Sequence, residues 1–450
     1  MSTSPIRQAP ETAWGRLRVD ESDVEDSPVI WQGDIAIVGG GSAGCSAAVA
    51  AARCGSSTLV VEGGGFLGGT ASAVLDTMYG FYAPGGEDRV VGGIGWEVAS
   101  RLIDTHQAFL RPNTYGAGTG VTYEPEALKA VWDSKVIDSG AEPLLHARMS
   151  AAIMRGPSIV GVVVLTRRGP FRVIAQRFVD ATGDADVAWA SGCALEMPTT
   201  GRRVQPLTAT FRVGGVANPA DNAVLHRLMR EAAGSGKYRL PRVEGSAHRT
   251  VNPGVFHTNM TRVSGIDPTD PWAYTAAEIE GRIQVAEYAR FLKDKVPGYE
   301  QSFLLNTSVW IGTRETRRLI GHYVLTREDV VGARQFADAV ALCGAPVEDH
   351  DGGQGTIWQH VGETGIPTGL TYGVPYRCLV PIETQGLLVA GRCLSATHDA
   401  HASVRSIAQC MALGQAAGTA AAMSFQAGKD LDAVDTEGLR QRLVSEGVVL

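Results

Sequence analysis

The chain has 450 residues and a formal net charge of -7, and it has no run of basic residues, which excludes an electrostatic surface for nucleic acid. Its seven cysteines are odd in number, scattered and without a CxxC pair. This pattern excludes a disulfide scaffold, a zinc site and a dithiol redox centre, and it favours a cytoplasmic location for the protein. The opening segment has no apolar signal and no apolar stretch reaches about 18 residues, so we expect a soluble protein that does not enter a membrane.

The first part of the chain is predicted to be a leader followed by a nucleotide-binding unit. Residues 1–31 are rich in Ser, Pro, Asp and Glu with little periodicity, so we expect them to form a mobile leader. From residue 32 a buried strand runs into the glycine-rich turn at 39–44. A small-residue helix to Arg53 and a second strand over 58–61 follow. This order of elements is typical of a dinucleotide-binding fold.

The glycines of this turn have separate roles. Gly39 allows the tight turn, Gly41 lets the backbone approach a pyrophosphate, and Gly44 lets the helix lie close to the sheet. The start of the helix, with Ser42 and Ala43, offers unpaired N–H groups to phosphates. At the end of the second strand, Glu62 is placed to accept hydrogen bonds from a ribose. The pattern predicts dinucleotide binding, and the alternative is a glycine-rich turn that binds nothing.

The next segments alternate between helical and strand patterns. The expected elements are a helix over 94–103, a helix over 126–139, a strand over 143–146, a hairpin of 159–166 with 171–178, and a helix that ends at Gly192.

Composition changes near Pro198, and residues 198–372 are richer in Arg, His, Thr and aromatic side chains, as expected around a substrate cavity. The clearest element there is a helix after Tyr274 with a capping box of Thr275 and Glu278. Its expected apolar face consists of Ile279, Ile283, Ala286 and Leu292.

The last third of the chain returns to the pattern of the first. A buried strand over 387–392 ends in glycine, and a long helix of small residues is predicted over 404–423. We therefore expect residues 32–197 and 373–428 to form one nucleotide-binding domain, residues 198–372 to be inserted as a substrate domain, and residues 429–450 to form a tail.

Several blocks together resemble the FAD-dependent oxidoreductases of the glutathione-reductase-like superfamily, most closely a bacterial branch related to fumarate reductase flavoproteins. The blocks are GGGSAG at 39–44 with Glu62, FLGGTAS at 66–72, DATGDADVAWASG at 180–192, RETRRLIGHYVLTREDV at 314–330, and LLVAGRCLSATHDAHASVRSIAQCMALGQAAGTAAAM at 387–423. The resemblance implies an α/β fold with a Rossmann-like FAD-binding domain, an inserted α+β substrate domain and FAD as the cofactor.

The resemblance also implies contacts of particular residues with FAD. The loop of Gly183 and Asp184 closes over the dinucleotide, and Gly391 and Arg392 lie near the pyrophosphate or the ribityl chain. Many relatives carry Asp where this chain has Arg392. Further cofactor contacts are implied at Gly68, Gly69 and Thr70, and at Ser403 and Val404, where the N-terminus of the long helix would point at the flavin ring.

Three residues are candidates for the chemistry itself. His401 and His398 could remove a substrate proton, because imidazole titrates near neutral pH, or they could only cap the helix. Arg314 could clamp a carboxylate, or belong to a solvated helix face. His257 could line the cavity or be a buried structural histidine. No third ligand is spaced near His398 and His401, so no metal site is expected there.

The sequence therefore predicts an FAD-dependent oxidoreductase that transfers a hydride between a polar small molecule and flavin N5. After the unit at 34–53, no second dinucleotide-binding unit of strand, glycine turn and helix is predicted, and no CxxC pair occurs, so oxygen or a separate carrier is the expected electron partner. The alternatives are a flavin-dependent monooxygenase, a non-redox flavoenzyme such as a dehydratase or isomerase, and a non-catalytic FAD-binding subunit of a redox complex. The oligomeric state is not predicted.

Overall fold

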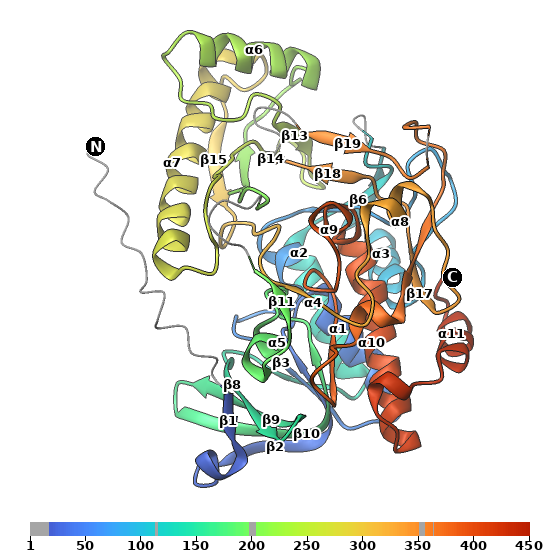
Figure 1. Ribbon diagram of the computed structural model, residues 1–450. Coiled ribbons are helices and arrows are strands. Elements are labelled where there is room, and N and C mark those ends of the chain that lie inside the picture. The colour runs from blue at the N-terminus through green and yellow to red at the C-terminus, as the bar shows by residue number, and fades with distance from the viewer. Residues whose placement is uncertain (1–17, 113–115, 198–203, 351–355, 363) are drawn as a thin grey trace.

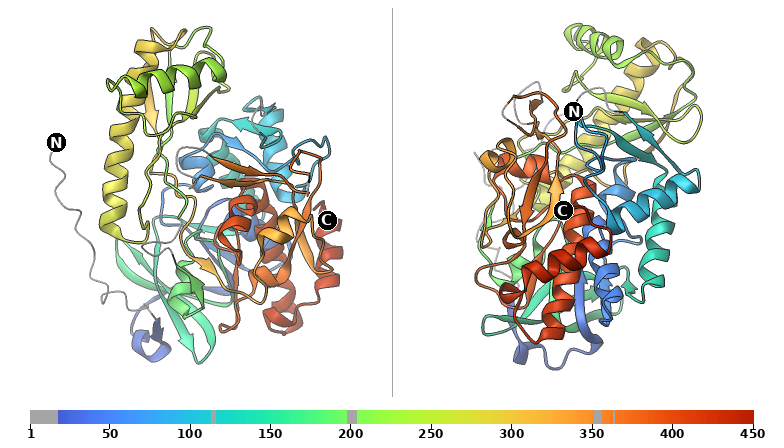
Figure 2. Two further views of the ribbon diagram at one scale, coloured as in Figure 1. Left: turned by 45° about the horizontal axis from the view of Figure 1, so that its top comes forward. Right: turned by 90° about the vertical axis from the view of Figure 1, so that its right-hand side faces the viewer.

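The computed structural model describes residues 18–112, 116–197, 204–350, 356–362 and 364–450. Two parts can be followed in Figure 1: a body built on the largest sheet, and a lobe that contains α6 and α7. The two further views in Figure 2 show the same lobe projecting from one end of the body. Over the described residues, no helix combines the length and the apolar character needed to span a bilayer.

Both parts combine helices with strands. The helices are α1 Ser42–Arg53, α2 Thr70–Ala73, α3 Gly93–Asp104, α4 Pro125–Asp138, α5 Asp186–Ser191, α6 Asn222–Gly234, α7 Pro271–Lys295, α8 Arg327–Val331, α9 His398–Val404, α10 Ile407–Ala427 and α11 Thr436–Ser445, with 3-10 turns η2 Glu21–Val24, η3 Tyr376–Leu379 and η4 Leu431–Ala433. The strands of the body's main sheet are β1 Arg18–Asp20, β2 Val29–Val38, β3 Thr58–Val61, β7 Glu142–Leu144, β8 Arg148–Arg155, β9 Ser158–Thr166, β10 Gly169–Asp180 and β21 Leu387–Val389. The remaining strands are β4 Thr77–Met78, β5 Ala108–Arg111, β6 Gly120–Tyr123, β11 Leu195–Glu196, β12 Phe211–Gly214, β13 Ser246–Arg249, β14 Phe256–Asn259, β15 Phe303–Thr307, β16 Arg318–Leu319, β17 Ala339–Cys343, β18 Val347–Asp349, β19 Ile357–Gln359 and β20 Tyr372–Pro375.

The main sheet is mixed, and its parallel part positions the site. Strands β21, β10, β2, β3 and β7 are parallel neighbours, whereas β8, β9 and the first half of β10 form an antiparallel meander. Val38 is opposite both Val61 and Asp180, and Asp180 is opposite Val389. The carboxyl ends of β2, β3, β10 and β21 therefore lie at one edge of the sheet, where parallel α/β folds bind their ligands.

The main sheet is buried on both faces. Along β2, Ile35 and Ile37 belong to the core formed with α1 and α10, and Ala36 and Val38 belong to the core formed with α5 and the meander. This alternation follows from the two-residue period of a strand. The lobe has its own core, in which α6 and α7 pack on the sheet β13-β14-β12-β15.

Helices α1 and α10 approach each other closely, as the small residues of α10 predict. A Cβ atom on Gly414 would lie 2.0 Å from the carbonyl oxygen of Ala43, and one on Gly418 would lie 2.1 Å from that of Ala47. The beginning and the end of the nucleotide-binding unit are therefore packed backbone against backbone.

The structure corrects three predicted elements. The expected leader is folded from Arg18 onward, where β1 pairs with β8 and β2 begins at Val29; residues 1–17 lie outside the described residues. Helix α7 begins at Pro271 with Asp270 as its cap, not after Tyr274. The helix predicted over 404–423 begins at Ile407 and runs to Ala427 as α10, and Val404 is instead the last residue of α9.

Candidate active site

The turn between β2 and α1 has the shape of a phosphate cradle. Gly39 has a φ of +98°, and a Cβ there would lie 2.5 Å from the carbonyl oxygen of Ala181. A Cβ on Gly44 would lie 1.8 Å from the carbonyl oxygen of Gly39, so the first turn of α1 needs glycine at both positions. A Cβ on Gly41 would meet no heavy atom within 4 Å. The open space beside Gly41 and the N-terminus of α1 fit the pyrophosphate of a dinucleotide.

The carboxylate of Glu62 is fixed beside this cradle. Its Oε2 accepts a hydrogen bond from the N–H of Gly40 at 2.8 Å, and its Oε1 accepts one from the N–H of Gly64 at 2.6 Å. The side chain is partly exposed, and each oxygen keeps a second lone pair. Glu62 is thus held where it can accept a further hydrogen bond, and its contact with a ribose stays a prediction.

The block at 66–72 lies on the glycine turn. The N–H of Gly68 donates to the carbonyl of Gly40 at 2.8 Å, and a Cβ on Gly69 would lie 2.8 Å from the Cα of Gly41. Helix α2 then begins at Thr70, which is exposed. The structure therefore brings Gly68, Gly69 and Thr70 to the cradle.

The late blocks meet the cradle from the other side. A Cβ on Gly391 would lie 2.9 Å from the Cβ of Ala43, which places the end of β21 on the first turn of α1. Arg392 Nη2 lies 2.7 Å from Asp184 Oδ1, and a Cβ on Gly183 would lie 3.0 Å from the same Nη2. Burial raises the pKa of Asp184, but the charge of Arg392 and the other bonds to its carboxylate outweigh this and lower it. Arg392 is therefore an ion-pair partner of the loop at 183–184.

The helix break at Arg405 and Ser406 corrects the predicted position of Ser403 and Val404. Both are buried in the last turn of α9, and the Ser403 hydroxyl donates to the carbonyl of Ala345 at 2.5 Å and lies 2.7 Å from the hydroxyl of Tyr372. They do not form a helix N-terminus. Helix α10 begins at Ile407 with Ser406 at its N-cap, and Ser406 is the sequence signal that could have located this start.

His401 is completely buried and holds the loop at Arg392. Its Nε2 donates to the carbonyl of Arg392 at 2.8 Å, while its Nδ1 has no hydrogen-bond partner among the described residues. Burial lowers the pKa of His401 well below its usual value, so the ring is neutral near pH 7. The arrangement makes His401 a positioning residue for the loop at Arg392.

His398 is held between two carboxylates. Its Nδ1 lies 2.9 Å from Glu315 Oε2, and its Nε2 lies 3.6 Å from Asp349 Oδ1. Burial alone lowers the pKa of His398, but Asp349 and Glu315 outweigh it and raise the pKa to about 9. The imidazole is therefore protonated at neutral pH, and it cannot remove a proton there without first losing one.

This charge state predicts a pH-dependent contribution of His398 to stability. Because its pKa in the folded protein is raised to about 9 from an unfolded value of about 6.5, the contribution is complete below about pH 6.5 and is lost as the pH rises through about 9. The urea midpoint of wild type should therefore exceed that of His398→Gln by more at about pH 6 than at about pH 10.

The control for this experiment is His226→Gln, which removes a histidine that bonds to the carbonyl of Gly245 on the surface of the lobe. A difference between wild type and His398→Gln that is the same at both pH values would contradict the ion-pair arrangement.

Arg314 lies in a cluster of cationic side chains. Its Nη1 donates to the carbonyl of Pro206 at 2.7 Å, and burial together with the charges of Arg405 and Arg242 lowers the pKa of Arg314 to about 9. The Nε atoms of Arg242 and Arg405 are buried and have no hydrogen-bond partner among the described residues. The Nε of Arg242 lies 3.8 Å from Glu244, which is too far for a hydrogen bond.

One carboxylate, Glu348, and one imidazole, His350, lie beside these arginines. Burial raises the pKa of Glu348, but His350, Arg405 and Arg314 outweigh it and lower it to about 2, so Glu348 is ionised. Burial and the charge of Arg314 lower the pKa of His350 to about 3, so its ring is neutral. The charge of Glu348 acts on all three arginines, and those of Glu244 and Glu315 act on Arg242 and Arg405 respectively. Even so, no described residue accepts a hydrogen bond from the Nε of Arg242 or of Arg405. We name Arg242, Arg314 and Arg405 the arginine cluster.

The arginine cluster was only partly predicted. Arg314 was a candidate from its sequence block, whereas Arg242, Arg405, Glu348 and His350 were missed. Arg405 directly precedes Ser406, the N-cap of α10, so its place beside a helix start could have marked it as a candidate. Nothing in the local sequence distinguishes Arg242 from a surface arginine.

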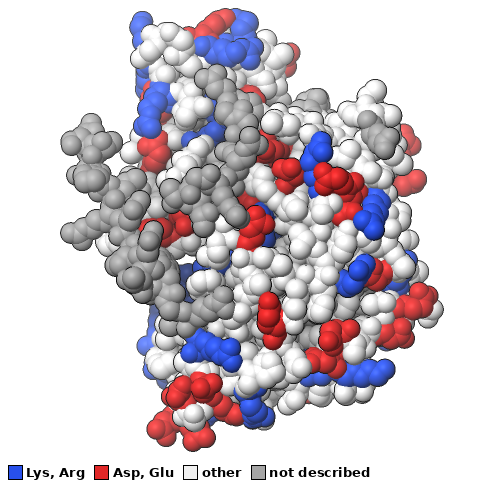
Figure 3. Space-filling model, in the orientation of Figure 1, with Lys and Arg blue, Asp and Glu red and all other residues white. Residues whose placement is uncertain are grey.

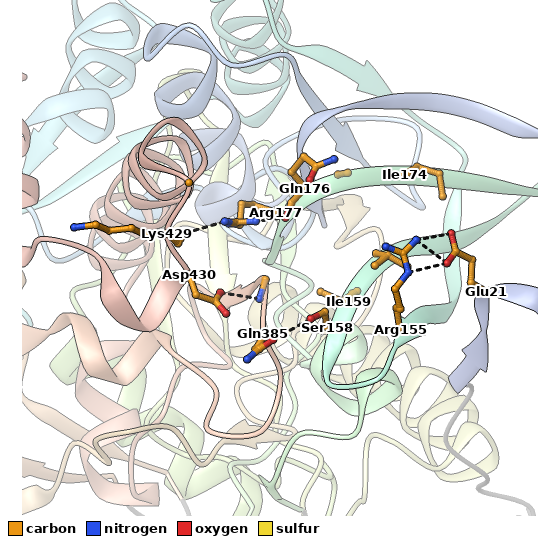
Figure 4. Close-up of a pocket in the computed structure, with 14 residues that line it drawn as sticks. Glu21, Arg155, Ser158, Ile159, Ile174, Gln176, Arg177, Gln385, Lys429 and Asp430 are labelled. Carbon is orange, nitrogen blue, oxygen red and sulfur yellow. Dashed lines mark hydrogen bonds and ion pairs between the residues drawn. The ribbon is translucent and has the colours of Figure 1, made fainter.

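A surface pocket of about 370 Å³ lies elsewhere, between the meander and the segment after α10. Figure 4 shows its walls, where Arg155 pairs with Glu21 and Asp430 bonds to the backbone of Gly386. It contains none of the predicted site residues. On the face of the molecule in Figure 3, acidic and basic side chains are interspersed.

The family described as FAD dependent oxidoreductase matches residues 34–443. No curated protein matches the sequence. Among solved structures, the chain is similar to a geranylgeranyl bacteriochlorophyll reductase-like protein from Thermoplasma acidophilum, at 13% identity and a TM-score of 0.46 over 92% of this chain and 84% of that one. It is also similar to the flavin-dependent brominase Bmp2, at 11% identity and a TM-score of 0.49 over 92% and 84%. Another similar structure is p-nitrophenol 4-monooxygenase PnpA from Pseudomonas putida DLL-E4, at 11% identity and a TM-score of 0.49 over 93% and 85%.

Proposed function

The chain belongs to the FAD dependent oxidoreductase family, whose cofactor is FAD, and we propose that it transfers a hydride between flavin N5 and a polar small molecule that carries a carboxylate. Bound FAD supplies the hydride chemistry, and the protein binds and orients the two reactants. Oxygen or a separate carrier completes the electron balance.

Within this family, we propose the glutathione-reductase-like arrangement and the branch related to fumarate reductase flavoproteins. The parallel strands β10, β2 and β3 with an antiparallel meander beside them support this assignment. Residues 32–197 and 373–428 would hold FAD, residues 198–372 would cover the substrate, and residues 429–450 would form the tail. The seven cysteines are free thiols, which supports a cytoplasmic location.

The cofactor would be held at the carboxyl edge of the main sheet. The glycine turn with Ser42 and Ala43 would receive the pyrophosphate, and Glu62 would bind the ribose. Gly68, Gly69 and Thr70 would complete one wall. Gly183, Asp184, Gly391 and Arg392 would form the other, in the position that His401 fixes through the carbonyl of Arg392.

The observation that carries the substrate class is the pair of buried, unpartnered Nε atoms in the arginine cluster. A buried guanidinium N–H without an acceptor is unfavourable, and an anionic oxygen is its strongest acceptor. Repulsion from Arg405 and Arg242 already lowers the pKa of Arg314, so a bound carboxylate would relieve this repulsion. The cluster is thus arranged to bind an anion.

His398 is proposed to hold and donate a proton beside this cluster. Its partner Glu315 directly follows Arg314, so one segment carries both the carboxylate that pairs with the protonated His398 and the arginine of the proposed clamp. With a pKa of about 9, the ring keeps its proton through neutral pH. This role replaces the proton removal that the sequence suggested.

The proposal is tested by anaerobic reoxidation of the reduced flavin. Matched pairs of small unsaturated or 2-oxo acids and the corresponding amides are mixed with the reduced holoenzyme, and the return of oxidised-flavin absorbance is followed. In this direction the substrate takes a hydride from flavin N5 and one proton, which the protonated His398 can supply. We expect acids to reoxidise the flavin and the matching amides to leave it reduced. Reoxidation by amides as fast as by acids would refute the carboxylate clamp, and a reduced flavin that no acid reoxidises would refute hydride transfer to a carboxylate substrate.

Replacing Arg314 should weaken substrate binding. Loss of a charge-assisted hydrogen bond worth about 1.5–3 kcal/mol predicts that Arg314→Met raises KM about 10- to 150-fold. Arg314→Lys should recover only part of this, because an ammonium group does not reproduce the bidentate fork. The control is Arg227→Met, which removes an exposed i,i+4 ion pair with Glu231 on α6. Unchanged KM in both Arg314 variants would contradict the clamp.

A further inference from the structure

A second cluster of titratable side chains lies outside the arginine cluster. Asp76 lies between α2 and β4, and His248 and His257 are opposite each other on β13 and β14. His248 Nε2 lies 2.8 Å from Asp76 Oδ1, and His257 Nδ1 lies 3.3 Å from the same oxygen. The lobe and the body therefore meet at these three side chains.

The cluster contains buried polar atoms that the described residues do not satisfy. His257 Nε2 lies 3.3 Å from the carbonyl oxygen of Val74, and because a carbonyl only accepts, this nitrogen carries the hydrogen. In the neutral ring, Nδ1 then presents a lone pair towards the Asp76 carboxylate. His257 Nδ1 and Asp76 Oδ2 are both buried and have no hydrogen-bond partner among the described residues. Asp76 is 1% exposed and His257 is 4% exposed, so bulk solvent does not reach the two atoms.

We propose that Asp76, His248 and His257 bind a divalent first-row transition metal ion. The ligand atoms would be a carboxylate oxygen of Asp76, Nε2 of His248 and Nδ1 of His257. One such atom from each residue lies within 4.8 Å of the others. Metal–ligand bonds of about 2.0–2.2 Å place neighbouring ligands about 2.8–3.1 Å apart at right angles and about 3.3–3.6 Å apart at tetrahedral angles. The separations of 2.8 and 3.3 Å from Asp76 Oδ1 lie within these ranges.

The chemistry of the donors selects the kind of ion. Two imidazoles and one carboxylate suit zinc or ferrous iron, whereas magnesium and calcium prefer oxygen donors throughout. The bond from His257 Nε2 to the Val74 carbonyl is the outer contact that usually orients a metal-binding histidine. The nearby Arg212 is ion-paired with Glu124 at 3.1 Å, which offsets its charge. Three protein ligands leave a coordination position open for water or an oxygen of a ligand.

Another potential metal-binding group, formed by Asp349, His398 and Asp399, is less suited to an ion. The Nδ1 of His398 is bonded to Glu315, and its Nε2 lies 3.2 Å from Gln205. Protein partners outside the group therefore occupy both ring nitrogens of His398. At the proposed site, His257 Nδ1 has no hydrogen-bond partner among the described residues, and His248 Nε2 has one partner outside the site, the Thr77 hydroxyl at 3.2 Å. The proposal for Asp76, His248 and His257 does not depend on the proposed function.

The test measures metal binding by the FAD-loaded protein, purified without a histidine tag and stripped with a chelator. We expect calorimetric titration with Zn²⁺ to show about one equivalent bound per chain, and Mg²⁺ not to compete. Asp76→Asn and His257→Gln should each abolish this binding. The glutamine variant keeps a donor for the Val74 carbonyl while removing the Nδ1 ligand, so it carries the test if Asp76→Asn fails to fold.

Two controls separate the outcomes. His226→Gln should bind Zn²⁺ as wild type does, and Asp399→Asn should do the same because it alters only the other group. Absence of Zn²⁺ binding by the wild type would overturn the proposal and leave an Asp–His hydrogen-bonded cluster. Binding that survives His257→Gln, or that is lost in Asp399→Asn, would place the ion elsewhere and overturn it as well.

Discussion

Replacing Gly414 with alanine is expected to destabilise the protein by about 2–3 kcal/mol, and Gly418→Ala should act similarly. The new methyl group would lie 2.0 Å from the carbonyl oxygen of Ala43 in the first variant and 2.1 Å from that of Ala47 in the second. Both contacts are with backbone, so no side-chain rotation relieves them and the helices α1 and α10 must separate. Urea unfolding followed by circular dichroism measures the change.

The sign of the effect is what makes this prediction informative. Alanine in place of glycine normally stabilises a helix by about 0.5–1 kcal/mol, because the unfolded chain loses freedom. Gly234, the last residue of α6, provides the control, since a Cβ there would meet no atom within 4 Å. We expect Gly234→Ala to be neutral or slightly stabilising. Wild-type stability in Gly414→Ala would show that α1 and α10 are not in backbone contact.

The same substitution should also weaken FAD binding. Ala43 lies in the first turn of α1, and Gly391 packs against its side chain. Moving α1 away from α10 would therefore shift the cradle relative to the loop at Gly391 and Arg392. A fall in the ratio of flavin to protein absorbance in Gly414→Ala, with little change in Gly234→Ala, is the expected result.

The nucleotide-binding unit was predictable because its constraints are local. Gly39 needs a positive φ, and Gly44 must be close to the backbone only five residues earlier. The sequence pattern of a strand, a glycine turn and a strand-end acid at Glu62 therefore predicts this geometry within one short segment. The small residues of α10 similarly predict its close packing on α1.

The start of α10 was placed wrongly because the break depends on distant partners. Ser403 is held by Ala345 and Tyr372, which belong to other parts of the fold, and this fixes the last turn of α9 separately from α10. In a sequence of small helix-forming residues, nothing before Ser406 marks the interruption.

The start of helix α7 was predicted wrongly although the sequence marks it. Asp270 caps the helix through bonds from Trp272 and Ala273, and Pro271 occupies its first position, which is a common start. The proposed capping box is absent, because Thr275 bonds to the Pro271 carbonyl and Glu278 accepts from the N–H of Ile311.

The predicted apolar face of α7 is also largely exposed. Ile279 is 51% exposed, Ile283 is 48% exposed and Ala286 is also exposed, so Leu292 alone of the four predicted residues is buried. Val285 and Tyr288, which were not predicted, are buried as well. The helix carries apolar residues on more than one face, so periodicity alone does not choose between them.

The charged clusters could not be assembled from the sequence. Arg242, Arg314 and Arg405 come from different segments, and so do Asp76 and the two histidines of the proposed metal site. Their chemistry depends on contacts that only the folded chain creates. This also explains why the sequence suggested a base at His398: its neighbours Glu315 and Asp349, which raise its pKa, are distant in sequence.

Glu62→Ala is the second substitution with a large expected effect. Hydrogen bonds to a charged group contribute about 1.5–3 kcal/mol, so loss of the ribose contact should weaken FAD binding about 10- to 150-fold. The variant also leaves the N–H groups of Gly40 and Gly64 without their carboxylate acceptor, which loosens the cradle itself. Titration of the apoprotein with FAD, followed by quenching of flavin fluorescence, measures the change.

Asp34 provides a matched control at the other end of the same strand pair. Its Oδ2 accepts from the N–H of Ser57 at 2.8 Å, just as Glu62 accepts from Gly40, but it lies at the amino end of the parallel strands, away from the cradle. Asp34→Asn should therefore cost stability without changing FAD affinity. If Glu62→Ala and Asp34→Asn retain FAD equally well, Glu62 only joins backbone segments, and the ribose must be held by other groups along the carboxyl edge of the sheet.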